Sequence, residues 1–260
     1  MITSSFSNLS SALLVLACFV FVMVASRAEA ISPTFQSSEG IVVAQSQAGS
    51  AADAASPHRA ERARRLVIFF HGIRSRGSIM EAIGNSWASV LPDTEFVSPD
   101  APFASNSRGR EWFVVDDQVM RPDRIEAARC AFDDLVSGIV KREAFENDLR
   151  NVVFVGVSQG AIVALDAVAT GRWKIGTLVS FAGLLPFPPT STSTSKDTAI
   201  LLMHGDADRR IPSIASVTAQ AQLKAAGYDV TYKLFPGVGH TISSEEAEQA
   251  GSFLRERLVN

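Results

Sequence analysis

The chain has 260 residues, a formal net charge of −3 and a hydrophobic content of 47%. These values are typical of one globular domain with a short extension. Apart from a run between Arg59 and Arg65, which we interpret as a solvated linker, the basic residues are scattered, so nucleic acid is not an expected partner. Because no group of His, Cys, Asp and Glu has metal-ligand spacing, we expect no metal site.

Residues 1–30 have the pattern of a secretory signal peptide. An uninterrupted apolar segment runs from Ala12 to Ala25, and a small-x-small cleavage site follows at Ala28-Glu29-Ala30. The segment is too short for a membrane span, although no Lys or Arg precedes it. We therefore expect a secreted or periplasmic protein with no stable span in the mature chain. The alternative is that this segment is retained and anchors the chain to a membrane.

Residues 31–64 are rich in Ser, Ala and Gln and have little hydrophobic periodicity, which is typical of a flexible linker. Residues 65–260 follow as the expected folded domain. Once the signal is removed, Cys130 is the only cysteine, so no intrachain disulfide can form. Because Cys130 lies within a helical pattern, residues 122–141, we expect it in the core rather than as a reactive thiol.

Short apolar runs alternate with helical patterns along residues 65–260. This alternation predicts right-handed βαβ crossovers and a mostly parallel central sheet flanked by helices, the α/β class. The polar segment 186–195 is too short for a large cap domain, and Ser243-x-x-Glu246 predicts a capping box at the start of the last helix. The expected strands are Leu66–Phe70, Glu95–Ser98, Val152–Val155, Thr177–Phe181, Ala199–Met203 and Val230–Phe235.

The most informative motif is Gly156-Val-Ser158-Gln-Gly160, which follows a β-branched run and precedes a helical pattern, Ala161 to Thr170. Strand, tight turn and helix are the context of a nucleophile elbow, with Ser158 at its tip. The flanking glycines allow the strand and helix backbones to approach closely. The alternative interpretation is a Gly-Ser turn without chemistry.

Such a serine needs a base and a carboxylate that orients the base. His240 is the only histidine well downstream of Ser158, so it is the predicted base, although a lone loop histidine is usually a surface residue. His71 and His204 each precede a glycine after an apolar strand and are expected to serve loop geometry. The carboxylate should follow residues 199–203, and spacing does not choose between the two candidates there, Asp206 and Asp208.

An oxyanion hole needs backbone N–H donors. One is expected from Gln159, the residue after the nucleophile, and the other from the loop after residues 66–70. In that loop the amide of Ile73 or of Arg74 is the candidate. The alternative is an ordinary strand-to-helix turn.

Six short blocks follow one another along the chain: Phe70-His-Gly-Ile73, Pro99-Asp-Ala-Pro102 with Trp112-Phe113, Gly156-Val-Ser-Gln-Gly160, Ala182-Gly-Leu-Leu-Pro186, His204-Gly-x-x-Asp208-x-x-Ile-Pro212 and Gly239-His240-x-Ile242. Over roughly residues 66–258 they resemble the phospholipase/carboxylesterase family of α/β-hydrolases, which includes acyl-protein thioesterases. The resemblance implies an α/β-hydrolase fold, Asp208 as the carboxylate and the Ile73 amide as the first oxyanion donor. Ala161 and Val114 depart from the family pattern.

These observations predict a serine esterase that acts through an acyl-enzyme on a small or lipid-like acyl ester and requires no cofactor. A lysophospholipase or acyl thioesterase with the same triad is the alternative; a non-catalytic binding protein or a peptidase is less favoured. The sequence does not predict the oligomeric state. Aromatic and leucine side chains after the strands are expected to line an acyl groove, although Trp112 and Phe113 equally fit packing against the core. These residues are Phe103, Trp112, Phe113, Leu184 and Leu185.

Overall fold

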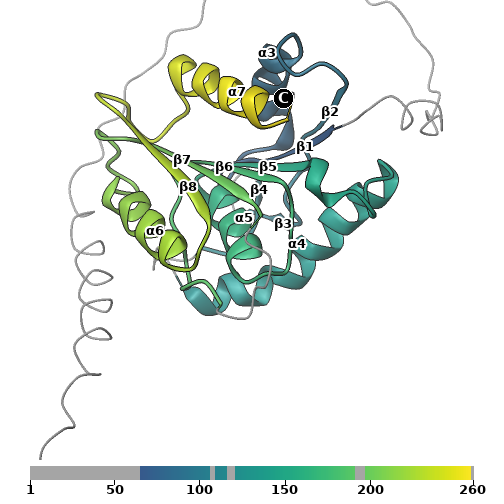
Figure 1. Ribbon diagram of the computed structural model, residues 1–260. Coiled ribbons are helices and arrows are strands. Elements are labelled where there is room, and N and C mark those ends of the chain that lie inside the picture. Colours follow the sequence, from purple (N-terminus) through teal and green to yellow (C-terminus); the bar gives the residue numbers. More distant parts are fainter. Residues whose placement is uncertain (1–64, 106–108, 116–120, 191–196, 259–260) are drawn as a thin grey trace, which may run out of the picture. The chain divides into compact units, whose positions relative to one another are not determined.

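The computed structural model describes residues 65–105, 109–115, 121–190 and 197–258. The expected signal peptide and linker, residues 1–64, lie outside the described residues. Within the described part, the predicted alternation of strands and helices is confirmed (Figure 1).

A six-stranded sheet forms the centre of the described residues, and each strand pairs in parallel with its neighbours. The strand order is β2-β1-β5-β6-β7-β8. Strand β2 therefore pairs with one edge of β1, and the chain then crosses over so that β5 pairs with the other edge of β1. In such a sheet, ligands bind beside the carboxyl ends of the strands where the direction reverses. The strands are β1 (Arg65–Phe70), β2 (Thr94–Val97), β5 (Val152–Val157), β6 (Thr177–Phe181), β7 (Ala199–Gly205) and β8 (Asp229–Phe235).

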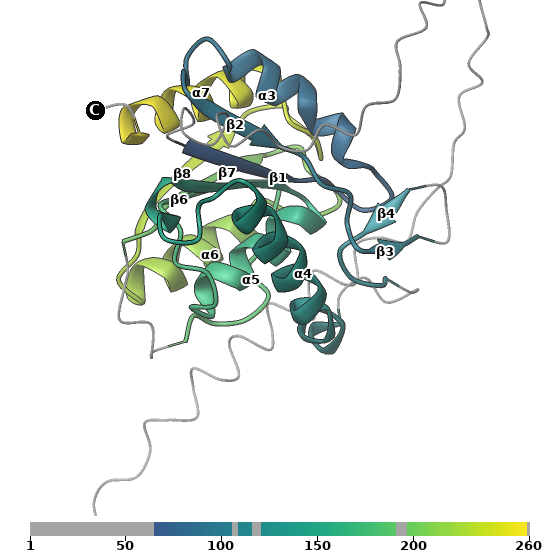
Figure 2. The same ribbon diagram turned by 90° about the vertical axis from the view of Figure 1, so that its right-hand side faces the viewer.

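Helices cover both faces of the sheet, as Figures 1 and 2 show. One face carries α4 (Pro122–Arg142), α5 (Gln159–Ala169) and α6 (Ile214–Ala225), and the other carries α3 (Glu81–Trp87) and α7 (Ser244–Leu258). Short 3₁₀ turns, η1 (Gly77–Met80) and η2 (Leu149–Asn151), precede α3 and β5. The four inner strands, β1, β5, β6 and β7, are buried along almost their whole length, which explains why they read as continuous apolar runs, whereas the edge strands β2 and β8 are only partly buried.

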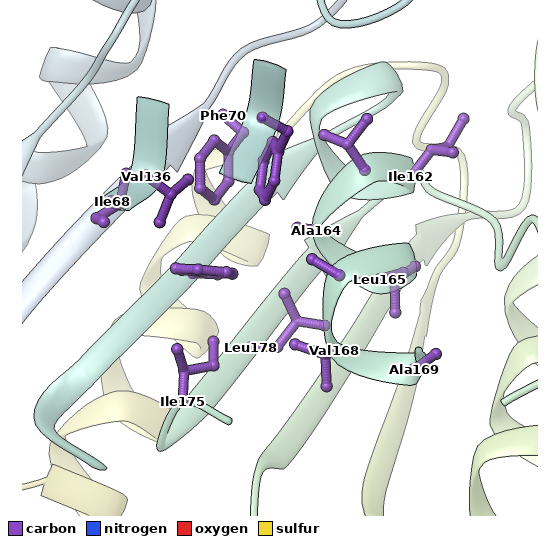
Figure 3. Close-up of a cluster of buried hydrophobic side chains, with 14 of the residues drawn as sticks. Ile68, Phe70, Val136, Ile162, Ala164, Leu165, Val168, Ala169, Ile175 and Leu178 are labelled. Atoms are coloured by element: carbon purple, nitrogen blue, oxygen red, sulfur yellow. The ribbon is translucent and has the colours of Figure 1, made fainter. Parts of the chain in front are cut away.

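Helix α5, which follows the predicted elbow, is buried along all eleven of its residues. Ile162, Leu165 and Val168 of this helix pack among sheet residues such as Phe70 and Leu178 (Figure 3). Burial of this extent stabilises the helix because each large aliphatic side chain gains about 1.5–3 kcal/mol when it is removed from water. The start of α5 is thereby held rigidly against the sheet.

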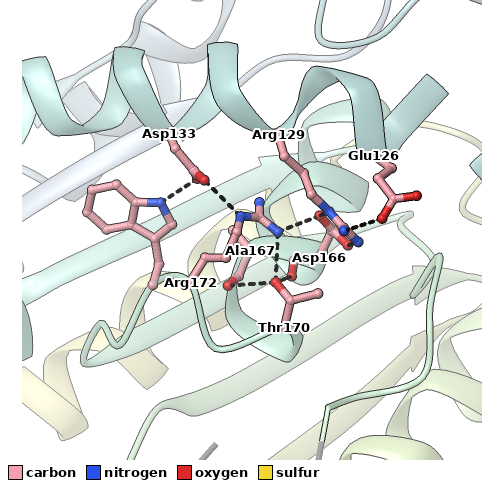
Figure 4. Close-up of polar contacts among 8 residues, drawn as sticks. Glu126, Arg129, Asp133, Asp166, Ala167, Thr170 and Arg172 are labelled. Carbon is pink, nitrogen blue, oxygen red and sulfur yellow. Dashed lines mark hydrogen bonds and ion pairs between the residues drawn. The ribbon is translucent and has the colours of Figure 1, made fainter. Parts of the chain in front are cut away.

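One charge is buried in α5, and it is paired. Asp166 is 1% exposed and accepts hydrogen bonds from Arg129 of α4 and from Arg172, each at 2.8 Å. Asp133 of α4 in turn accepts hydrogen bonds from Arg172 at 2.8 Å and from the Trp173 indole at 2.7 Å (Figure 4). The two arginines offset the cost of burying the Asp166 charge and connect α4 to α5.

One expectation is corrected, one pair of strands was not predicted, and one expectation is confirmed. Cys130 is exposed, not in the core, because the buried face of α4 runs through Ala128 and Phe132 and leaves residue 130 on the outer side. The segment after Ala101 contains an unpredicted antiparallel pair, β3 (Phe103–Ala104) with β4 (Arg110–Glu111). The capping box is present: the Ser243 amide donates to Glu246 Oε2 at 2.8 Å, and the Glu246 amide donates to Ser243 Oγ at 3.2 Å.

Candidate active site

Ser158 is the single residue between β5 and α5, and its backbone has φ 54° and ψ −119°. This left-handed conformation is unfavourable for a side chain with a Cβ and persists only where the surroundings impose it. Here the Ser158 amide donates to the Phe181 carbonyl at 3.0 Å, and the Ser158 carbonyl accepts from the Ile162 amide at 3.0 Å. The turn therefore presents the Ser158 side chain at the carboxyl edge of the sheet.

The two glycines of the motif are required by close backbone approach. A Cβ on Gly156 would lie 2.6 Å from the Ala161 Cα, and a Cβ on Gly160 would lie 2.1 Å from the Phe70 carbonyl oxygen. Neither neighbour can move easily, because both are backbone atoms. The pattern of two glycines around Ser158 thus has a packing cause, as the sequence predicts.

Three side chains form a continuous hydrogen-bonded row at this edge. His240 Nε2 lies 2.8 Å from Ser158 Oγ, and His240 Nδ1 lies 2.7 Å from Asp208 Oδ2. Because an ionised carboxylate only accepts, Nδ1 carries the proton and Nε2 accepts from the serine hydroxyl. The Asp208 side chain is fully buried, and the His240 side chain is 16% exposed. This arrangement can remove a proton from Ser158 and hold the resulting imidazolium.

The carboxylate of Asp208 is held by donors on both oxygens. Its Oδ1 accepts from the amides of Arg210 at 2.8 Å and Ile211 at 3.0 Å, while Oδ2 faces His240. Burial by itself raises the pKa of Asp208, but the hydrogen bonds from His240 and the two amides outweigh it, so the pKa lies below its ordinary value. Asp208 is therefore ionised at neutral pH.

Asp206, the other candidate carboxylate, is exposed and has a different partner. Its Oδ1 accepts from the Gly237 amide at 2.6 Å, and its own amide donates to the Phe235 carbonyl at 3.0 Å. These bonds hold the turn that leads from β8 to His240. The structure thus places Asp208, and not Asp206, against the imidazole.

The loop after β1 lies beside Ser158. A Cβ on Gly72 would be 3.6 Å from Ser158 Cβ. The amide of Arg74 donates to the Arg110 carbonyl at 2.9 Å and is therefore engaged, whereas no acceptor for the Ile73 amide is found within the part of the chain that the structure describes. Gln159 is the first residue of α5, so its amide has no acceptor within the helix.

His71 holds this loop, as the sequence predicts, and the Gln159 side chain holds the neighbouring segment at Trp112 and Phe113, a role that the sequence does not predict. His71 Nε2 accepts from the Ala101 amide at 3.0 Å, so Nδ1 carries the proton and donates to the Gly72 carbonyl at 2.7 Å. Burial lowers the pKa of His71, which keeps the ring neutral. Gln159 Oε1 accepts from the Trp112 amide at 2.8 Å, and Gln159 Nε2 donates to the Phe113 carbonyl at 2.7 Å.

The expected groove residues divide into two groups. Trp112 is fully buried and Phe113 is 2% exposed, and both belong to the core on the α5 side of the sheet. The Trp112 indole also donates to the His71 carbonyl at 2.8 Å. These two residues therefore pack the segment against the core instead of lining an open groove. Leu185 is buried as well, whereas Phe103 and Leu184 are half-buried.

We expect Trp112→Ala to destabilise the fold without changing acyl-chain preference. Removing a buried tryptophan costs about 3–5 kcal/mol and leaves the His71 carbonyl without a donor. The measurements are Tm and kcat/KM for p-nitrophenyl esters of graded chain length. Phe103→Ala, at a half-buried position, is the matched variant in which chain preference should change. A Trp112→Ala variant that loses chain preference at unchanged Tm would contradict the core assignment.

The described residues contain neither a candidate membrane span nor a candidate metal site. Among residues 65–105, 109–115, 121–190 and 197–258, no helix is long and apolar enough to cross a bilayer. In the same residues, no group of three or more His, Cys, Asp or Glu side chains is placed to hold a metal ion.

A mostly parallel sheet with helices on both faces and a strained serine between β5 and α5 defines the α/β-hydrolase class. The model of the Phospholipase/Carboxylesterase family matches residues 52–258. The chain therefore belongs to the phospholipase/carboxylesterase family, as the sequence blocks predict.

Individual relatives agree with this assignment. The chain is 31% identical to the Escherichia coli esterase YpfH over 196 residues, which is 74% of this chain and 83% of the relative. It is 28% identical to acyl-protein thioesterase 1 of Gibberella zeae over 232 residues, 79% of this chain and 93% of the relative. The crystal structure of esterase PE8 superposes with a TM-score of 0.68 at 32% identity, covering 75% of this chain and 94% of that chain. The protein is a hydrolase related to carboxylesterases.

Proposed function

We propose that the protein hydrolyses carboxylic esters with Ser158 as nucleophile, His240 as general base and acid, and Asp208 as the group that orients His240. The observation that carries this proposal is the row of contacts from Ser158 Oγ through the imidazole to Asp208, at 2.8 and 2.7 Å. A serine hydroxyl becomes a useful nucleophile only with such a base in contact.

In the proposed reaction, Ser158 Oγ attacks the ester carbonyl as its proton passes to His240 Nε2. The amides of Ile73 and Gln159 donate to the oxyanion that develops; the contact between the Gly72 region and Ser158 supports this placement. His240 then protonates the leaving alcohol, and an acyl-Ser158 ester remains. Water, deprotonated by His240, attacks this ester, and His240 returns the proton to Ser158 Oγ as the acid leaves.

A fluorophosphonate probe tests the proposal directly. We expect stoichiometric labelling of the native protein, with the label on the peptide that contains Ser158, because the probe reacts only with an activated serine. Heat-denatured protein and a Ser158→Ala variant are the controls, and both should remain unlabelled. Absence of labelling in folded wild-type protein would contradict catalysis and favour a binding protein on the same fold.

An acyl thioesterase is the second candidate, because one similar relative is named acyl-protein thioesterase 1. The same row of side chains can attack a thioester, and the leaving group is then a thiol. Oxygen esters and thioesters with identical acyl chains, compared by kcat/KM, separate the two activities. A higher value for the oxygen ester at each chain length is expected under the primary proposal.

We also propose that the protein is exported. The apolar segment Ala12 to Ala25 and the cleavage site Ala28-Glu29-Ala30 support this. Mass spectrometry of the mature protein should find Ile31 at the N-terminus. An intact Met1 in a soluble cytosolic fraction would contradict export, and an intact chain in the membrane fraction would favour the anchored alternative.

A further inference from the structure

His204 is a fully buried histidine at the end of β7 that the proposed mechanism does not use. Its Nε2 lies 2.7 Å from the Ile211 carbonyl oxygen and 3.3 Å from Asp208 Oδ2. Its Nδ1 lies 2.7 Å from the hydroxyl of Ser216, a residue of α6 that is 2% exposed. The ring therefore lies between the carboxylate and the helix behind it.

The neighbours of the ring determine its tautomer. The Ile211 carbonyl and the Asp208 carboxylate can only accept, so Nε2 carries the proton and Nδ1 accepts from the Ser216 hydroxyl. The Nε2 proton is donated to the Ile211 carbonyl at 2.7 Å, and Asp208 Oδ2, at 3.3 Å, is its second and more distant acceptor. Burial lowers the pKa of His204, so the ring is neutral. Because Nδ1 accepts a hydrogen bond and Nε2 donates one, the neutral ring has only one orientation that makes both.

Asp208 Oδ2 is consequently shared by two imidazoles from different elements. His240 Nδ1 approaches it at 2.7 Å from the loop after β8, and His204 Nε2 approaches it at 3.3 Å from the end of β7. The amides of Arg210 and Ile211 occupy Oδ1. The buried carboxyl of Glu246, which the Ser243 amide and hydroxyl hold, is a further ionisable group near Asp208.

We propose that His204 is a positioning residue: its Nε2–H, shared between the Ile211 carbonyl and Asp208 Oδ2 and backed by Ser216, holds the Asp208 carboxylate in the orientation that His240 requires. The inference rests on the proposed function of Ser158, His240 and Asp208. The physical reason is that a carboxylate free to rotate about its Cβ–Cγ bond would present its oxygens to His240 less often in line with Nδ1. Small misplacements of this kind slow catalysis strongly.

The chain offers a matched pair of variants. In His204→Asn, the amide reaches only the position of Nδ1, so the contact with Ser216 survives and the donor toward both the Ile211 carbonyl and Asp208 is lost. In His204→Gln, the longer amide can place a donor near the position of Nε2. We expect His204→Asn to lower kcat on the order of 10- to 100-fold with KM nearly unchanged, and His204→Gln to recover most of that loss.

A spectroscopic signature distinguishes positioning from general destabilisation. The Nδ1 proton between His240 and Asp208 should give a low-field ¹H NMR resonance in the wild type, and this resonance should broaden or vanish in His204→Asn and return in His204→Gln. Tyr228→Phe is the stability control. It removes another buried hydrogen bond, from the Tyr228 hydroxyl to the Val168 carbonyl at 3.0 Å, and should lower Tm while kcat and the resonance stay unchanged.

Two outcomes would overturn the inference: wild-type kcat in His204→Asn, or equal losses in both variants with the low-field resonance intact. If His204→Asn does not fold, Ser216→Ala decides instead. Loss of the Ser216 hydroxyl should lower kcat and weaken the resonance, and an unchanged kcat and resonance would overturn the proposal. The proposed function is tested separately: if the wild type turns over the ester and Ser158→Ala does not, the proposed function holds even where the inference about His204 fails.

Discussion

We expect Ser158→Ala to lower kcat by roughly 10³-fold or more and His240→Ala to lower it to a similar extent, while both proteins remain folded. The losses are similar because the serine and the imidazole act as a unit. Without the base, the hydroxyl keeps its proton; without the hydroxyl, the base has no nucleophile to activate. The Ser158→Ala, His240→Ala double variant should therefore be little slower than either single variant.

The measurements are kcat on a p-nitrophenyl ester and Tm by circular dichroism. Ser86→Ala is the matched control, because the Ser86 hydroxyl of α3 donates only to the local Ile83 carbonyl at 2.7 Å. Its kcat should equal that of the wild type. Near-native esterase activity in Ser158→Ala or His240→Ala would remove the basis of the proposed function.

The second large effect separates the two aspartates. Asp208→Asn should lower kcat by about 10⁴-fold, because the amide oxygen is needed by the Arg210 and Ile211 amides, which leaves the NH₂ group facing His240 Nδ1. To avoid two donors in contact, the imidazole must move its proton to Nε2. In that tautomer it can no longer accept the proton of Ser158.

Asp206→Asn should have a far smaller effect on kcat. Its Oδ1 can still accept from the Gly237 amide, so the turn before His240 is preserved. Both variants are isosteric with the wild type, so a comparison of kcat at equal Tm separates chemistry from stability. Greater loss of activity in Asp206→Asn than in Asp208→Asn would contradict the geometry of the site.

Features that depend on neighbouring residues were predictable from the sequence. The elbow around Ser158 follows from a β-branched run, two glycines and a helical pattern, all within a few residues of one another. The parallel sheet follows from alternating strands and helices, because βαβ crossovers have one hand. The capping box at Ser243 is equally local, since a side chain and an amide three residues apart satisfy each other.

Choices that depend on distant contacts could not be made from spacing: the family resemblance implied Asp208 and the Ile73 amide, and the tertiary structure supplies the physical reason. Asp206 and Asp208 both suit the turn after β7, and only the direction of the loop carrying His240 places Asp208 within 2.7 Å of Nδ1. Likewise, the Arg74 amide is not free to serve as the oxyanion donor because it donates to the Arg110 carbonyl of β4, a contact that spacing does not predict. Neither partner lies close enough in sequence for spacing to select it.

Burial was decided by the tertiary structure in the same way. For Trp112, the sequence left an acyl groove and packing against the core equally open. It lies in the core because the Gln159 side chain holds its backbone amide and the His71 carbonyl accepts from its indole. Cys130 is exposed because it lies on the face of α4 opposite to the buried residues Ala128 and Phe132.

The sequence by itself determined the class of fold and the types of side chain available for chemistry, since these depend on local pattern. Which of those side chains meet was decided by packing between elements far apart in the chain.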